Sequence, residues 1–186
     1  MKLKKNQLWK SLPADLKPHN FQYELGKWYK QEGTIKACNN GFHGSKRVID
    51  AMQYVDLEVL ALAEVRGQSD KEGNKECWEE IKLVKAWKWE KKDSVELAIF
   101  AAELVIDIFE KEHPDDKRPR EAIDAAKNWL KNPTEENRVA NAAYAAYAAN
   151  AAYAANAAYA AYAASVKILD KCEAFIQKKI KNLKPI

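Results

Sequence analysis

The chain has 186 residues, of which 47% are hydrophobic and six are tryptophan, so it can build a core and is not globally disordered. Its net charge of +4 is too small for a strongly basic nucleic-acid binder and has the wrong sign for a nucleic-acid mimic. The basic start, Met1–Lys5, is not followed by an apolar stretch, so we expect no signal peptide. Three cysteines without metal-ligand spacing fit a reducing compartment, and we expect a cytoplasmic protein.

Residues 1–92 have the pattern of a small α+β domain. Short stretches rich in aromatic and β-branched residues are separated by glycines, which is typical of strands joined by turns. One helix is expected from Ser45 to about Tyr54. The strand-like stretches are residues 21–29, 33–37, 55–65 and 81–89.

From Asp93 the pattern changes to helices, and we expect an all-α bundle over residues 93–186. Asp93-Ser94-Val95-Glu96 resembles a capping box, which begins a helix. Four helices in succession with short links indicate a bundle. We expect them at residues 93–112, at residues 116–131 with Pro119 in the first turn, from Asn132-Pro133-Thr134-Glu135 through the alanine-rich run, and at residues 166–183.

An alanine-rich run, residues 140–164, contains only alanine, tyrosine and asparagine in an Ala-Ala-X frame. Alanine has the highest helix propensity, so we expect one long helix, although a turn at Asn150 or Asn156 is an alternative. A helix without a charged face is usually buried all round. Its asparagines and tyrosine hydroxyls do not suit a membrane, so we expect no membrane partner. Three helices and a small sheet cannot cover it fully, which favours a homo-oligomer or a bound partner.

Two groups of residues outside this run are candidate sites. His43 and Ser45 could line a ligand pocket, although a helix entry with Ser45 as cap explains them as well. Lys85, Trp87, Lys88 and Trp89 interleave aromatic and basic side chains as a binding surface does, but an edge strand with one buried tryptophan is the simpler interpretation. Tyrosine is common where proteins dock, so the interface hypothesis also includes the tyrosines of the run, Tyr144, Tyr147, Tyr153, Tyr159 and Tyr162.

The second half of the chain resembles a known family in several segments. The stretch His113-Pro114-Asp115-Asp116-Lys117-Arg118-Pro119-Arg120-Glu121-Ala122-Ile123, then Ala125-Ala126-Lys127-Asn128-Trp129-Leu130 and the Ala-Ala-X run, is similar to the alanine-rich immunity protein family. The resemblance covers about residues 95–175 and implies an all-helical protein from a bacterium or phage. It implies no particular binding residue.

The first half resembles an uncharacterised phage and bacterial domain with a Gly-Phe-His motif. The matching residues are Phe21-Gln22-Tyr23-Glu24-Leu25-Gly26-Lys27, Cys38, Gly41-Phe42-His43 and Val48-Ile49-Asp50-Ala51-Met52-Gln53-Tyr54. Gly41-Phe42-His43-Gly44-Ser45, followed by a helix and the strand 59–65, is also distantly similar to the ADP-ribosyltransferase core. That family implies a catalytic glutamate and a first-strand Arg or His, for which Trp9-Lys10-Ser11 is a poor substitute. A degenerate scaffold is the better interpretation.

These patterns predict a small α+β domain followed by an all-α bundle with one long Ala/Tyr-rich helix. We expect a non-enzymatic inhibitor that docks sterically on a protein target, either a toxin or a host defence effector such as a CRISPR nuclease. We expect no catalytic residue, cofactor or metal, and no nucleic acid as the primary partner. One alternative is a degenerate ADP-ribosyltransferase-like or nucleotide-binding protein, and another is a structural helical protein that self-associates.

Overall fold

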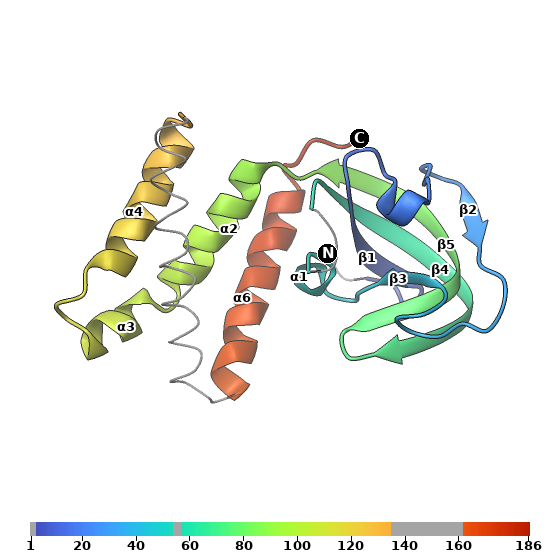
Figure 1. The fold of residues 1–186 in the computed structure, drawn as a ribbon, viewed down its shortest axis with the longest axis horizontal. Coiled ribbons are helices and arrows are strands. Elements are labelled where there is room, and N and C mark those ends of the chain that lie inside the picture. The colour runs from blue at the N-terminus through green and yellow to red at the C-terminus, as the bar shows by residue number, and fades with distance from the viewer. Residues whose placement is uncertain (1–2, 54–56, 135–161) are drawn as a thin grey trace. The chain divides into compact units, whose positions relative to one another are not determined.

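The computed structural model describes residues 3–53, 57–134 and 162–186, and it divides into two compact units. The first unit comprises Met1–Glu90 together with Glu173–Ile186, and the second comprises Lys91–Cys172. A five-stranded antiparallel sheet dominates the first unit (Figure 1). A domain division at residues 92 and 93 stays a prediction.

The sheet is built on a long hairpin of two 14-residue strands, β4 and β5. Gly73 begins the two-residue turn of this hairpin with a φ of 60°, a value that glycine adopts without strain. The strand order is β1-β4-β5-β2, and β3 also pairs with β5. The strands are β1 (Gln7–Leu12), β2 (Trp28–Lys30), β3 (Phe42–Gly44), β4 (Val59–Glu72) and β5 (Lys75–Lys88).

One glycine of this hairpin does not separate strands, although the sequence pattern suggested that it would. Gly67 lies within β4 at a φ of 85°, where the register with β5 shifts between Arg66 and Ser69. It therefore permits a bulge and does not end the strand. Of the other predicted strand stretches, residues 21–29 contain only the start of β2, and residues 33–37 form no strand.

The two edges of the sheet meet at a single backbone pair, because Trp9 of β1 pairs with Ser45 directly after β3. The core inside the curled sheet contains Leu8, Phe42, Ile81 and Leu83, all at most 5% exposed. The short helix α1 (Val48–Ala51) contacts β1. It is shorter than the helix predicted for residues 45–54, and a single 3₁₀ turn, η1 (Pro18–Asn20), precedes β2.

The second unit contains the helices α2 (Lys91–Glu103), α3 (Ile106–Glu112) and α4 (Arg118–Lys131). The predicted helix 116–131 with a proline in its first turn is confirmed by α4. The prediction of one helix over residues 93–112 is wrong, since Val105 departs from helical geometry at φ −125° and ψ −12°. The break lets Ile106 pack with Ile99 of α2 and Ile123 of α4 in a small core.

The prediction that the second half is an all-α bundle with one long helix is also wrong. The helix α6 (Tyr162–Ile180) begins within the alanine-rich run, but residues from Glu173 onward belong to the unit that holds the sheet. Ile176 and Ile180 are buried, so the apolar face of the last helix does not serve a separate bundle. Most of the predicted Ala/Tyr helix, residues 135–161, lies outside the described residues.

The end of the chain returns to the sheet. The N–H of Lys88 donates to the carbonyl of Lys184 at 3.0 Å, and the N–H of Ile186 donates to the carbonyl of Ala86 at 3.2 Å. An isolated bridge between Trp87 and Pro185 lies between these bonds. The last residues therefore extend the pairing of β5 at its C-terminal end.

Candidate functional site

A cleft of about 550 Å³ opens in the first unit where β1, β3 and the segment around η1 come together. We call it the β1–β3 cleft. A volume of this size is typical of small-molecule sites. Its lining includes Lys10, Phe21, Tyr23, Phe42, His43 and Ser45.

The cleft depends on close backbone contact between β1 and the end of β3. The N–H of Trp9 donates to the carbonyl of Ser45 at 2.8 Å, and the N–H of Ser45 donates to the carbonyl of Trp9 at 2.9 Å. Gly44 leaves room for this pair, because a Cβ there would lie 2.8 Å from the carbonyl oxygen of Trp9. The approach places Lys10 and His43 on the same cleft.

Lys10 is the main charged group of the cleft. Its Nζ donates to the carbonyl of His43 at 2.9 Å and lies 5.5 Å from the centre of the Tyr23 ring. Burial lowers the pKa of Lys10 to about 8. Among the described residues, no carboxylate lies within ion-pair distance of its ammonium group.

His43 is held in its neutral form. Its Nε2 accepts a hydrogen bond from the backbone N–H of Cys38 at 3.0 Å, which requires that nitrogen to be unprotonated. Burial lowers the pKa of His43, and the positive charges of Lys10 and Lys75 lower it further. The imidazole therefore offers a polar edge to the cleft but little charge near neutral pH.

Ser45 does not cap a helix, because α1 begins after Arg47 and has no side-chain cap on that residue. Its hydroxyl is fully buried and, within the part of the chain that the structure describes, has no hydrogen-bond partner. The structure thus brings Ser45 and His43 to one cleft, while their role as a ligand pocket stays a prediction.

Phe21, Tyr23 and Phe42 line the cleft, and Tyr29 packs against the first two of these rings. Phe21 contacts Tyr23, Tyr29 and Phe42 edge-on, with ring centres 4.9, 5.2 and 5.4 Å apart. Tyr23 and Phe42 are buried, whereas Phe21 remains 37% exposed. The pKa of Tyr23 is raised mainly by burial, so its hydroxyl stays protonated at physiological pH.

The predicted aromatic and basic surface on β5 is only partly exposed. Lys85 and Lys88 are exposed, and the Nζ of Lys88 lies 3.1 Å from a carboxylate oxygen of Glu90. Trp87 is half-buried, with its ring centre 5.9 Å from that of Trp9. Trp89 is only 2% exposed, so its side chain belongs to the interior and cannot serve as an exposed contact.

The predicted tyrosine contacts all belong to the alanine-rich run. Tyr162 is the first residue of α6. Tyr144, Tyr147, Tyr153 and Tyr159 lie outside the described residues.

Sequence reasoning missed Lys10 and Tyr23 as members of the cleft. A signal existed for Lys10, since it is the one charged residue in Leu8–Leu12, and the other four residues of that stretch are buried. A lysine inside a buried strand needs a polar partner. Tyr23 gave no comparable signal.

Over the described ranges, no group of three His, Cys, Asp or Glu side chains is placed to hold a metal ion. Of the helices in the same ranges, none combines the length and the apolar character that crossing a membrane requires. Localisation in the cytoplasm stays a prediction.

Comparisons with known proteins give two adjoining family matches. Residues 6–93 match the model of a domain of unknown function, DUF7666, and residues 87–168 match the family described as "Imm-5 like putative immunity protein". No curated protein and no solved structure matches the chain. These matches do not test whether the Gly-Phe-His motif and the alanine richness characterise the two families, and the likeness to ADP-ribosyltransferases stays a prediction from the sequence. The chain is thus similar to a DUF7666 domain over residues 6–93, followed by an Imm-5 like immunity domain over residues 87–168.

Proposed function

We propose that this protein protects against a protein toxin by binding it without chemically changing it. The match of residues 87–168 to the Imm-5 like family is the observation that carries this proposal. A toxin is the partner that such a family suggests. Action against a CRISPR nuclease or another host defence effector, a phage origin and self-association are further predictions that rest on the sequence alone.

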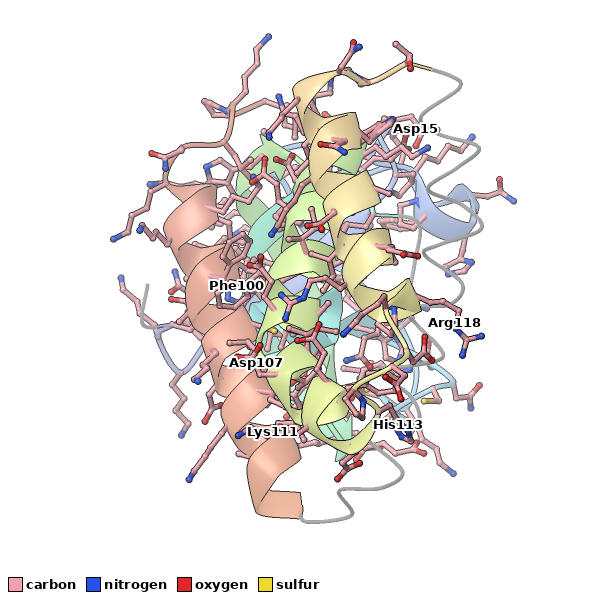
Figure 2. All side chains as sticks on the ribbon, turned by 90° about the vertical axis from the view of Figure 1, so that its left-hand side faces the viewer. Asp15, Phe100, Asp107, Lys111, His113 and Arg118 are labelled. Atoms are coloured by element: carbon pink, nitrogen blue, oxygen red, sulfur yellow. The ribbon has the colours of Figure 1, made fainter. Side chains whose placement is uncertain are left out.

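A rigid support would suit such binding, and the second unit has features of one. Arg120 of α4 bonds to both carboxylate oxygens of Glu110 at 2.8 and 2.6 Å and to Asp107 at 3.2 Å, which fastens α3 to α4. This hydrogen bonding holds the pKa of Glu110 below its usual range. Figure 2 labels Asp107 on α3 and Arg118 at the start of α4. A preorganised helix pair loses little conformational entropy when a partner docks.

The contacts of the proposed complex would come from exposed side chains on either unit. On β5, exposed Lys85 and Lys88 and half-buried Trp87 are candidate contacts, whereas Trp89 is buried and would make none. On α3, Ile108 is a large apolar side chain that remains 38% exposed. Steric docking needs a surface of this mixed kind and no reactive group.

Titration against toxins tests the proposal. A panel of bacterial toxin domains is incubated with increasing amounts of the purified chain, and residual toxin activity, complex formation by gel filtration and toxin mass are measured. A binding inhibitor removes activity at an equimolar ratio, co-elutes with the toxin and leaves its mass unchanged. Protection at far below equimolar amounts with an altered toxin mass contradicts the proposal, as does failure to neutralise any toxin of the panel.

A matched pair of variants tests the β5 contacts. Replacing Lys85 and Lys88 together by alanine is expected to weaken neutralisation, because both charges lie on the candidate surface. Replacing Lys4 and Lys5, which are exposed elsewhere on the first unit, gives the control with the same change of charge. Equal loss in both double variants assigns the effect to net charge and removes the β5 contacts from the proposal.

A further inference from the structure

We propose that the β1–β3 cleft binds a small organic anion in which a carboxylate or phosphate is joined to a planar ring. Lys10 would hold the anionic group, and Phe21, Tyr23 and Phe42 would contact the ring. This site lies in the first unit, within the DUF7666 match, and it does not depend on the proposed binding of a toxin.

The charge of the cleft supports an anion. Lys10 is half-buried, and its ammonium group has one carbonyl partner and, among the described residues, no carboxylate partner. A charge removed from water is costly unless an opposite charge compensates it. Lys75 also lines the cleft, and none of the described residues that line it is Asp or Glu. An anionic ligand would supply the negative charge that the protein itself does not place beside Lys10.

The lowered pKa of Lys10 agrees with a partly buried ammonium group that has no carboxylate beside it among the described residues. Its ammonium group loses hydration through burial, and no neighbouring carboxylate offsets that loss. At a pKa of about 8 the side chain is still mostly protonated at neutral pH, so it can bind an anion there. A bound anion would raise this pKa again.

The aromatic side of the cleft supports a ring. Phe21 is 37% exposed, although it packs edge-on against Tyr23 and Phe42. Aromatic rings prefer offset or edge-on partners, and burying their surface against one another stabilises the contact. A planar ligand in the cleft could cover the free part of Phe21 while its anionic group reaches Lys10. Neutral His43 offers a polar edge nearby.

A purely structural role for Lys10 is the competing explanation. The bond from its Nζ to the carbonyl of His43 joins β1 to β3 and requires no ligand. In that case the lysine would matter for stability, and the cleft would hold only water. Binding measurements separate the two explanations.

The experiment uses the full chain, labelled with ¹⁵N, and follows backbone amide shifts by NMR. Two ring-bearing anions, AMP and benzoate, are titrated to distinguish a phosphate from a carboxylate. Adenosine supplies a ring without the anion, and inorganic phosphate supplies the anion without a ring. Each titration is repeated on Lys10→Met and on the control variant Lys5→Met, which removes an exposed lysine of the same unit.

We expect AMP or benzoate to shift the amides of Lys10 and of residues 41–45, with about tenfold weaker binding to Lys10→Met and unchanged binding to Lys5→Met. The proposal is overturned if neither ring-bearing anion shifts these amides, or if Lys10→Met binds as tightly as the unchanged protein. Adenosine that binds as well as AMP refutes the anion. Inorganic phosphate that binds as well as AMP refutes the ring.

Discussion

Glu173 on α6 accepts a hydrogen bond from the backbone N–H of Ile49 at 3.0 Å, although 124 residues separate them in the chain. The other carboxylate oxygen of Glu173 accepts from the N–H of Val48 at 3.2 Å. The first N–H groups of a helix have no partner within it, and Arg47 provides no side-chain cap for α1. A distant glutamate thus performs the role that a local cap usually has.

Replacing Glu173 by alanine is expected to destabilise the first unit by about 1–2 kcal/mol, because two N–H groups of α1 lose their acceptor. Chemical denaturation followed by circular dichroism measures the change. Lys178→Ala, at an exposed position of the same helix, serves as control and should change the stability little. Equal stability of Glu173→Ala and the unchanged protein would show that water replaces the carboxylate at no cost.

Replacing Gly44 by alanine is expected to cost about 1–3 kcal/mol, since the new Cβ would collide with a backbone oxygen that cannot turn aside. That oxygen belongs to Trp9 and would lie 2.8 Å from the Cβ. Thermal unfolding measures the loss. Gly73→Asn is the control, because a Cβ at Gly73 meets nothing within 4 Å and asparagine tolerates a positive φ. A larger loss at Gly73 than at Gly44 would contradict the close approach of β1 and β3.

Lys10 should make the free energy of unfolding depend on pH between about 8 and 10.5. These are the pKa of its side chain in the folded protein and the ordinary pKa of a lysine, which applies to the unfolded chain. In this window the unfolded chain binds more protons than the folded one, so the free energy of unfolding rises with pH. The shift corresponds to at most about 3 kcal/mol. Urea denaturation from pH 7 to 10.5 measures the rise, and Lys10→Met should lack it.

The comparison between the two proteins is needed because other groups titrate nearby. Burial raises the pKa of Tyr23 and of Cys77, and both effects lower the stability as pH increases. These contributions are shared by the unchanged protein and Lys10→Met, so they cancel in the difference. A difference that stays constant with pH would mean that Lys10 is as well hydrated as an ordinary surface lysine.

Replacing Arg120 by lysine should destabilise the second unit by only about 0.5–1 kcal/mol, because the pairs with Glu110 and Asp107 lie near the surface. Lysine keeps the positive charge but cannot bond to both oxygens of one carboxylate in the same plane. The measurement is the unfolding midpoint at low and at high salt. A loss of stability that is independent of salt would assign the effect to packing of the aliphatic part of the Arg120 side chain and not to its charge.

The sequence predicted the helix boundaries that depend on the residues at the boundary itself. The proline in the first turn of α4 marked the start of that helix, and the predicted end at residue 112 is the end of α3. The split between α2 and α3 carries no glycine or proline, and it follows from the burial of Ile106 against another helix. Patterns within one segment do not contain that information.

The site was less predictable for a related reason. Its formation needs the backbone pairing of Trp9 with Ser45, which joins two segments that no spacing rule connects. Ser45 looked like a helix cap because the sequence does not show that α1 begins later. The polar partner of Lys10 is likewise a backbone carbonyl, which every residue carries and no sequence pattern reveals.

Because Lys184–Ile186 pair with the end of β5, both ends of the chain belong to the unit that holds the sheet. This affects where the length of the chain can change. The chain leaves the sheet unit after Glu90 and re-enters it at Glu173, so the intervening residues form an insertion anchored at both ends. Insertions of this kind tolerate changes in length, because neither anchor has to move. The Ala-Ala-X run, residues 140–164, falls within this insertion in the sequence, so a change in the number of its triplets adds or removes no residue of the sheet or of the β1–β3 cleft.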